Sequence, residues 1–321
     1  YFACVLEPGD IIQVMERAWH EAMDGRKGPV WIDMPVDVQN RQVPEAAEGG
    51  PLPSRAAVSP DLAAIAQGLA RAEKPLILAG GGVRSAGAAA QLNRLCQTLQ
   101  IPAALSRGGI DVMASSSPYF VGRPGSYGDR ASHFAIQQCD YLLILGSRLS
   151  ISTTGYYPQR FGQNAHKVMV DIDQLELDKP DVPVDVKLCM DLKDFLEGLC
   201  GCCEGLDPVD HGAWLAHCQE MRRQYPNVQP GYAQEHPLNS YYFTHKLSQC
   251  APAECSIVVD TGSVCNIVSQ SWELKEGQRY LISGGLSAMG FWAGAIGAVQ
   301  EGRQVLALSG DGSVQMNVQE F

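Results

Sequence analysis

The residues best suited to chemistry stand together near the end of the chain. An apolar run at 305–308 leads through one serine into residues 310–313, which read Gly-Asp-Gly-Ser. Such a turn exposes backbone N–H groups beside a carboxylate, at the edge where open α/β sheets bind ligands. Magnesium prefers oxygen ligands and often bridges protein carboxylates to phosphates. We therefore predict that Asp311 binds a metal ion, and that Gly310 and Gly312 allow a diphosphate to approach closely.

The rest of the chain supplies elements that would position this turn. Apolar segments typical of buried strands alternate with segments whose apolar residues recur at helical spacing. The expected strands lie at 29–33, 75–79, 101–105, 141–145, 167–171, 256–260 and 304–308. The expected helices include 8–22, one behind the capping residue Asp61, one carrying Leu92, Leu95 and Leu99, and one at 289–299. This alternation predicts an α/β fold with doubly wound parallel sheets.

Two segments interrupt the alternation. Residues 38–60 lose periodicity and gather Pro, Gly, Glu and Ala, as an interdomain linker does. Residues 201–237 are polar and, apart from a helix-like pattern around Trp214, are expected to be mostly a connector. We therefore predict a complete central domain at 58–205, flanked by partial α/β domains at 1–48 and 239–321. Because the outer domains are partial, we expect an internal piece of a longer protein.

The composition argues against several classes of protein. The formal net charge of −11 is spread over 18% charged residues, without a basic stripe that could follow the phosphates of a nucleic acid. No apolar run reaches the roughly 18 residues of a membrane span, and the first residues do not resemble a signal peptide. We expect a cytoplasmic protein with no nucleic-acid or membrane partner.

The cysteines are expected to be reduced. There are 11 of them, an odd number, and most lie in apolar segments. This favours buried thiols over the disulfide framework of a secreted protein. The group Cys200, Cys202 and Cys203, with His211 and Cys218 downstream, also allows a zinc site. Its spacing contains no CxxC pair, which favours a plain thiol cluster.

The segments on both sides of the predicted turn resemble a known family. Residues 283–291 read Ser-Gly-Gly-Leu-Ser-Ala-Met-Gly-Phe, residues 293–298 read Ala-Gly-Ala-Ile-Gly-Ala, and residues 313–320 read Ser-Val-Gln-Met-Asn-Val-Gln-Glu. In this order around Gly-Asp-Gly, they resemble the thiamine-diphosphate enzymes, and within them the large subunits of acetolactate synthases. The resemblance extends over the whole chain.

The resemblance implies an identity for each unit. Residues 1–48 look like the end of the family's pyrimidine-binding domain, and 58–205 like its central domain, which binds FAD in some members. Residues 239–321 look like the first part of its diphosphate-binding domain. The implied cofactors are thiamine diphosphate and Mg²⁺, and FAD is allowed.

The resemblance also implies roles for individual residues. Those expected to contact thiamine diphosphate or its metal are Gly285, Met289, Gly310, Asp311, Gly312 and Ser313, with Asp311 as the metal ligand. Arg148 and Asp171 are similar to positions that contact FAD in flavin-containing members. The glycine-rich segments 80–82 and 107–109 also follow strands, where a dinucleotide could lie. No catalytic residue is assigned, because the family's acidic residue would precede Tyr1.

The chain departs from the family pattern at two places. Acetolactate synthases typically show Gln-His-Gln followed by Met-Trp, where residues 261–270 read Thr-Gly-Ser-Val-Cys-Asn-Ile-Val-Ser-Gln. Residues 149–155 also lack the usual Asp-Asp-Arg. The substrates and the flavin are therefore left open.

Simpler interpretations stand beside these roles. Residues 80–82 lack a GxGxxG pattern and equally fit a tight strand-to-helix turn. Arg148 could pair with a surface carboxylate. The group Met289, Phe291 and Trp292 has the composition of a helix core, which is a commoner use of such residues than ligand contact.

The expected function is decarboxylation of pyruvate or another 2-keto acid, followed by carboligation to a second keto acid. The resemblance implies a homodimer or homotetramer, and we expect this chain alone to be inactive. Three alternatives remain: a decarboxylase or lyase with the same cofactor, a non-catalytic nucleotide-binding relative, and a nicotinamide-dependent oxidoreductase. The last would need a dinucleotide fingerprint, which the sequence lacks.

Overall fold

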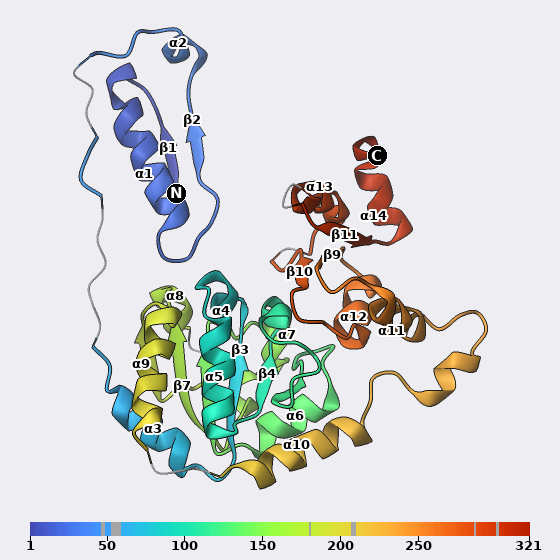
Figure 1. Cartoon of the computed structure of the whole chain (residues 1–321). Coiled ribbons are helices and arrows are strands. Elements are labelled where there is room, and N and C mark those ends of the chain that lie inside the picture. Colours follow the sequence, from blue (N-terminus) through green and yellow to red (C-terminus); the bar gives the residue numbers. More distant parts are fainter. Residues whose placement is uncertain (46–48, 53–58, 180, 207–209, 286, 300–301) are drawn as a thin grey trace.

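The computed structural model describes residues 1–45, 49–52, 59–179, 181–206, 210–285, 287–299 and 302–321. In these ranges the chain forms three parallel sheets of two, six and three strands, each with its own helices (Figure 1). The predicted α/β fold with parallel sheets is confirmed. None of the helices described is long and apolar enough to cross a membrane.

The first unit is small. It contains β1 (Phe2–Cys4), the 3-10 helix η1 (Pro8–Asp10), α1 (Ile11–Met23), β2 (Trp31–Asp33) and α2 (Val36–Gln39). Strands β1 and β2 pair in parallel. The predicted helix and strand are confirmed as α1 and β2, whereas α2 occupies the start of the expected linker. Residues 46–48 and 53–58 of that linker lie outside the described residues.

The central unit contains the six-stranded sheet. Its strands are β3 (Pro75–Ala79), β4 (Ala103–Leu105), β5 (Phe120–Gly122), β6 (Tyr141–Leu145), β7 (His166–Asp171) and β8 (Val186–Cys189). Its helices are α3 (Leu62–Arg71), α4 (Gly81–Ser85), α5 (Ala89–Leu99), η2 (Arg107–Val112), α6 (Arg130–Gln138), α7 (Ile151–Thr154), η3 (Pro158–Arg160), α8 (Gln174–Leu177), α9 (Leu192–Glu204) and α10 (Gly212–Gln224). The strand order β5-β4-β3-β6-β7-β8 reverses direction between β3 and β6, which makes this pair the topological switch point.

Both faces of the six-stranded sheet are buried. Along β3, Ile77 packs with α3, α5 and α9, while Leu76 and Leu78 pack with α6 and α10. Successive strand residues point to opposite faces, so a strand covered on both sides must be apolar throughout. This is why the chain shows continuous apolar runs here rather than alternating ones.

Helix α10 corrects one prediction. Residues 201–237 were expected to be mostly a connector, yet 212–224 form a helix of 13 residues. Trp214 and Cys218 are buried in the core beneath the sheet, and the Trp214 Nε1–H donates to the Pro75 carbonyl at 2.9 Å. Packing of this apolar pair outweighs the polar composition of the segment.

The third unit carries the predicted turn. It contains η4 (Pro230–Gln234), α11 (Ser240–Cys250), β9 (Cys255–Val259), α12 (Ser263–Ser271), β10 (Arg279–Ile282), η5 (Phe291–Ala293), α13 (Gly294–Val299), β11 (Gln304–Leu308), α14 (Asp311–Met316) and η6 (Val318–Glu320). The sheet order is β10-β9-β11, all parallel. The strands predicted at 256–260 and 304–308 are confirmed as β9 and β11, each within one residue.

The helix predicted at 289–299 is wrong in its first part. Gly290 has a φ of +90°, a conformation that L side chains rarely adopt, and a 3-10 turn precedes α13. A Cβ at Gly290 would also lie 2.4 Å from the Asn317 Nδ2. The helix therefore starts only at Gly294.

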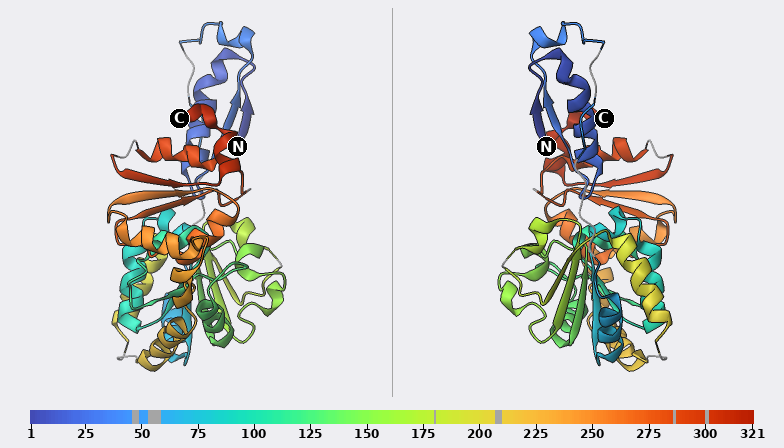
Figure 2. Two further views of the ribbon diagram at one scale, coloured as in Figure 1. Left: turned by 90° about the vertical axis from the view of Figure 1, so that its right-hand side faces the viewer. Right: turned by 90° about the vertical axis from the view of Figure 1, so that its left-hand side faces the viewer.

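The central and third units lie next to each other in both side views (Figure 2), and η2 contacts elements of both. The Asp111 carboxylate accepts hydrogen bonds from the Arg84 Nε at 3.2 Å, the Arg279 Nε at 3.1 Å and the Tyr280 N–H at 3.1 Å. The side chain of Ile110 lies in the core of the third unit. One buried carboxylate thus holds elements of both units.

Candidate functional site

The order β10-β9-β11 brings three strand ends to one edge of the third sheet. Asp260 directly follows β9, residues 283–285 follow β10, and residues 309–313 follow β11. The backbone confirms the proximity of two of them, because the Asp260 N–H donates to the Leu308 carbonyl at 2.9 Å. Segments far apart in sequence therefore meet at the carboxyl edge, where ligands bind in open α/β sheets.

Asp311 is exposed at this edge and begins α14. Its carboxylate makes no hydrogen bond or ion pair with any of the described residues, so both oxygens are available. Apart from its neighbours Ser309 and Asp311, no described residue has a heavy atom within 4 Å of a Cβ built on Gly310. A free hard ligand beside open space, at the first N–H groups of a helix, fits Mg²⁺ and the diphosphate of thiamine diphosphate.

The residues predicted around the turn are only partly brought together. A Cβ on Gly312 would lie 3.3 Å from the Met289 Cε, so these two residues are neighbours. Ser313 is buried and its carbonyl accepts a hydrogen bond from the Trp292 Nε1–H at 3.2 Å. Gly285 lies at the same edge after β10, with open space beside it, and no described contact joins it to the turn.

Met289 and Trp292, two of the residues with the composition of a helix core, differ in burial. Trp292 is buried, whereas the Met289 side chain is half exposed. The core interpretation therefore holds for Trp292. Met289 keeps the exposure that a cofactor contact requires, and its role stays a prediction.

Asp260 lies beside the turn and was not singled out by sequence reasoning. It is fully buried, and its Oδ2 accepts hydrogen bonds from the Ser309 Oγ at 2.9 Å and the Trp292 N–H at 3.1 Å. Its Oδ1 accepts from the Thr261 N–H at 2.8 Å. The available signal was an aspartate at the end of an apolar strand, the same pattern that singled out the Gly-Asp-Gly turn.

Of the two residues predicted to contact FAD, Arg148 follows β6 and Asp171 is the last residue of the adjacent strand β7. The Arg148 Nε donates to the Glu176 Oε1 at 2.7 Å. Asp171 is buried and accepts a hydrogen bond from the Asp173 N–H at 3.0 Å. Burial raises the pKa of Asp171, and that hydrogen bond opposes the shift. Both predicted residues have protein partners, and the flavin stays a prediction.

Glu176 is the centre of a charge cluster that includes Arg148. The Glu176 side chain is only 5% exposed, and it is paired with Arg26, Arg148 and Lys179. Burial raises its pKa, but the hydrogen bonds from these three cations outweigh burial, and the net pKa is lowered. The expected partner of Arg148 was a surface carboxylate; the actual one is buried. Arg26 links the first unit to the central one here.

This cluster predicts an acid-sensitive contribution to stability. The folded pKa of Glu176 lies below its ordinary value of 4.5, so the contribution is complete above pH 4.5 and is lost as the pH falls below it. In Glu176→Gln, we expect the urea midpoint to be lower at neutral pH and to change less between neutral and acidic pH. Urea titrations at a series of pH values measure this. The exposed Glu276→Gln is the control, and equal pH profiles for Glu176→Gln and the wild type would contradict the prediction.

The glycine-rich segments of the central unit serve packing. A Cβ on Gly80 would lie 2.2 Å from the Gly146 carbonyl oxygen, and the Gly82 N–H donates to that same carbonyl at 3.0 Å. This supports the tight-turn interpretation of 80–82. In the other segment, the Arg107 side chain donates to the Asn266 Oδ1 at 2.8 Å, across to the third unit. Close backbone packing therefore accounts for the glycines of 80–82, and Arg107 connects the central unit to the third.

The cysteine group does not form a metal site. Among the residues that the structure describes, no cluster of three or more His, Cys, Asp or Glu could hold a metal ion. The His211 ring lies between the carbonyls of Leu99 and Ala72, at 2.7 and 3.1 Å. Burial raises the pKa of Cys203 to about 12, so its thiol stays protonated. These contacts support the interpretation as a plain thiol cluster.

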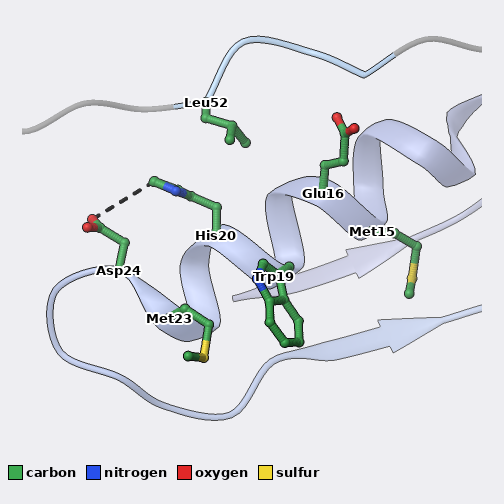
Figure 3. A pocket seen from close by; sticks show the side chains of 7 residues that line it. All are labelled: Met15, Glu16, Trp19, His20, Met23, Asp24 and Leu52. Carbon is green, nitrogen blue, oxygen red and sulfur yellow. Dashed lines mark ion pairs between the residues drawn. The ribbon is translucent and has the colours of Figure 1, made fainter. Parts of the chain in front are cut away.

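A hollow of the molecular surface lies on the first unit, away from the turn (Figure 3). It is lined by one side of α1, including Met15, Trp19 and Met23, together with Leu52. The His20 Nε2 is 3.9 Å from the Asp24 Oδ2 at its end. None of the predicted cofactor residues lines this hollow, and it is not part of the candidate site.

Comparison with known proteins agrees with this architecture. Residues 62–199 match the family model described as thiamine pyrophosphate enzyme, central domain. Residues 260–321 match that described as thiamine pyrophosphate enzyme, C-terminal TPP binding domain. Together the two ranges make up more than half of the chain, and the second contains both Asp260 and Asp311.

Several relatives carry the name acetolactate synthase. The chain is 32% identical to the acetolactate synthase isozyme 1 large subunit of Escherichia coli (strain K12), over 97% of the chain and 55% of that protein. It is 30% identical to the acetolactate synthase large subunit of Lactococcus lactis, over 99% of the chain and 56% of that protein. It thus spans about half the length of these relatives. With two family domains matched and a glycine-flanked carboxylate at the sheet edge, the chain belongs to the thiamine pyrophosphate enzymes.

Proposed function

We propose that the edge formed by β9 and β11 binds the diphosphate of thiamine diphosphate through Mg²⁺. The observation that carries this proposal is the exposed Asp311 carboxylate, which has no partner among the described residues and stands beside the open space at Gly310. Magnesium is typically bound by one or two carboxylates together with ligand phosphates, so a single aspartate at this edge is a sufficient start.

Each residue of the turn would make a different contact with the cofactor. Asp311 would provide an anionic oxygen ligand, and the first N–H groups of α14 would donate to phosphate oxygens. Met289, beside Gly312, would contact the part of the cofactor that lies beyond the diphosphate. Bound thiamine diphosphate supplies an electron sink for carbanion chemistry.

We infer that the complete protein decarboxylates pyruvate or another 2-keto acid and joins the product to a second keto acid. Two lines of support exist: the family to which the chain belongs, and the name acetolactate synthase that its relatives carry. A decarboxylase or lyase with the same cofactor is the second candidate. It rests on the departure of residues 261–270 from the acetolactate synthase pattern.

The test uses the full-length protein from which this sequence comes. Isothermal titration calorimetry with thiamine diphosphate, with and without Mg²⁺, measures cofactor binding, and product analysis after incubation with pyruvate identifies the reaction. We expect Mg²⁺-dependent binding and acetolactate as the product. Acetaldehyde as the main product would favour the decarboxylase. No binding under either condition would refute the proposal.

The remaining proposals are checked on the same sample. The visible absorption spectrum reports whether FAD is bound near Arg148 and Asp171. Light scattering distinguishes the proposed homodimer and homotetramer from a monomer. The 321-residue chain alone is expected to show no turnover, because it spans about half the length of the relatives that it matches.

A further inference from the structure

We propose that Asp260 is the positioning residue of the cofactor turn: its buried carboxylate joins the end of β9 to Ser309 and Trp292 and thereby fixes where Asp311 stands. This inference rests on the proposed function, because it concerns the same turn. It goes further because it proposes that a residue outside the turn determines the conformation of the turn.

The first step is the contact geometry. Asp260 is fully buried, and its two oxygens accept three hydrogen bonds, from the Thr261 N–H, the Trp292 N–H and the Ser309 Oγ, at 2.8 to 3.1 Å. Three segments thus converge on one carboxylate. Ser309 immediately precedes the Gly310–Asp311 pair, so the bond to Ser309 holds the turn at its entry.

The second step concerns the other side of the turn. Trp292, held by Asp260 through its backbone N–H, donates its indole Nε1–H to the Ser313 carbonyl at 3.2 Å. The entry and the exit of residues 310–312 are therefore both connected to Asp260, one directly and one through Trp292. The Asn317 Nδ2 adds a parallel connection to the Gly290 carbonyl at 2.8 Å.

The third step is energetic. A buried carboxylate is costly unless its oxygens are satisfied by hydrogen bonds, so the native arrangement of all three donors is strongly favoured over its alternatives. Ligand groups must be held within about 0.5 Å of their productive position to be effective. Because the Asp260 side chain is buried, its effect on the turn is transmitted through Ser309 and Trp292.

Asp260→Asn separates positioning from simple packing. Asparagine has nearly the same shape, but one of its two terminal groups is an NH2 donor instead of an acceptor. This NH2 group would face another donor, the backbone N–H of either Thr261 or Trp292. The Ser309 hydroxyl can rotate to accept instead of donating, whereas a backbone N–H cannot. We therefore expect the substitution to displace the backbone at Thr261 or at Trp292 without opening a cavity.

The test compares three variants of the full-length protein: Asp260→Asn, Ser309→Ala and Ser256→Ala. Ser256 is the matched control, since its hydroxyl is buried on β9 and has no hydrogen-bond partner among the described residues. We expect the Kd for thiamine diphosphate with Mg²⁺ to rise about 10- to 100-fold in Asp260→Asn and about 3- to 10-fold in Ser309→Ala. Ser256→Ala should keep the wild-type Kd.

Two readouts distinguish positioning from a general loss of structure. A positioning defect raises the apparent Kd for thiamine diphosphate. It leaves the KM for the keto acid unchanged when the cofactor is saturating. Partial unfolding lowers kcat without changing the affinity of the folded molecules for the cofactor. In the double variant Asp260→Asn/Ser309→Ala, we expect the rise in Kd to differ from the product of the two separate rises, because Asp260 and Ser309 belong to one hydrogen-bond network.

The outcomes are separable from those of the proposed function. If the wild type does not bind thiamine diphosphate, the proposed function fails. If the wild type binds and the folded variants bind equally well, the positioning role of Asp260 is refuted. Where Asp260→Asn does not fold, the comparison of Ser309→Ala with Ser256→Ala decides, and equal Kd values for these two refute the inference.

Discussion

Asp311→Ala in the full-length protein is expected to abolish Mg²⁺-dependent uptake of thiamine diphosphate and to lower turnover by at least about 100-fold. Loss of residues that merely support metal ligands already costs about 10- to 100-fold, so loss of a direct ligand should cost more. The fold should be unaffected, because Asp311 is exposed and its carboxylate has no partner among the described residues. Calorimetry and steady-state kinetics measure the two effects.

Two further variants make the Asp311 result specific. Asp311→Asn keeps one oxygen ligand and loses the charge, so we expect an intermediate affinity for the cofactor. Glu320→Gln removes an exposed carboxylate beyond the same helix and should behave as the wild type. Normal cofactor affinity in Asp311→Ala would show that the metal ion is held elsewhere.

Arg123→Met is expected to lower the free energy of unfolding by about 3–5 kcal/mol, the usual cost of breaking a buried charged network on one side. The Arg123 guanidinium is buried and donates to the carbonyls of Ser269 and Trp272, at 2.8 and 3.3 Å, and to the Ser115 Oγ at 3.1 Å. Burial lowers the pKa of Arg123, and the nearby Asp129 opposes that shift. Methionine would remove the donor to the carbonyls of Ser269 and Trp272.

The effect of Arg123→Met should also appear in the shape of the unfolding curve. Arg123 follows β5 of the central unit, whereas its two carbonyl partners belong to the third unit. We therefore expect the two units to unfold in separate steps in urea, followed by circular dichroism and tryptophan fluorescence. Arg223→Met, which removes an exposed ion pair with Glu220, is the control and should change stability by less than about 1 kcal/mol. Equal stability of the two variants would contradict the assigned role of Arg123.

Strands that are buried on both faces could be predicted well from the sequence. Strands β3 and β6 match their predicted ranges residue for residue, and all their residues are buried. An uninterrupted apolar run has few alternative interpretations when turn residues limit it to strand length. The cap at Asp61 was predictable for a similar reason, since it depends on the local bond from the Ala64 N–H.

The missed elements depend on contacts that are distant in sequence. Strand β10 has four residues, and its placement involves Asp111, which is 168 positions from Arg279. Strand β8 is partly exposed and has no apolar run of its own. Helix α10 is polar except for the side that packs beneath the central sheet. A local pattern contains no information about such partners.

The candidate site shows the same division. Residues 310–313 are contiguous, so their composition alone predicted a turn at a strand end. The hydrogen-bond donors to Asp260 could not be predicted, because Trp292 and Ser309 are 32 and 49 positions away in the sequence. Only the pairing of β9 with β11 brings them together.

The position of Asp111 has a consequence for motion between the central and third units. Its single carboxylate is shared between Arg84 on one side of the boundary and Arg279 with Tyr280 on the other. A small rotation of the third unit would lengthen the hydrogen bonds from Arg279 and Tyr280 while the bond from Arg84 remained. The buried Asp111 carboxylate would then keep only part of its hydrogen bonds. Gradual sliding is therefore unfavourable, and relative movement of the two units should occur by abrupt release and re-engagement.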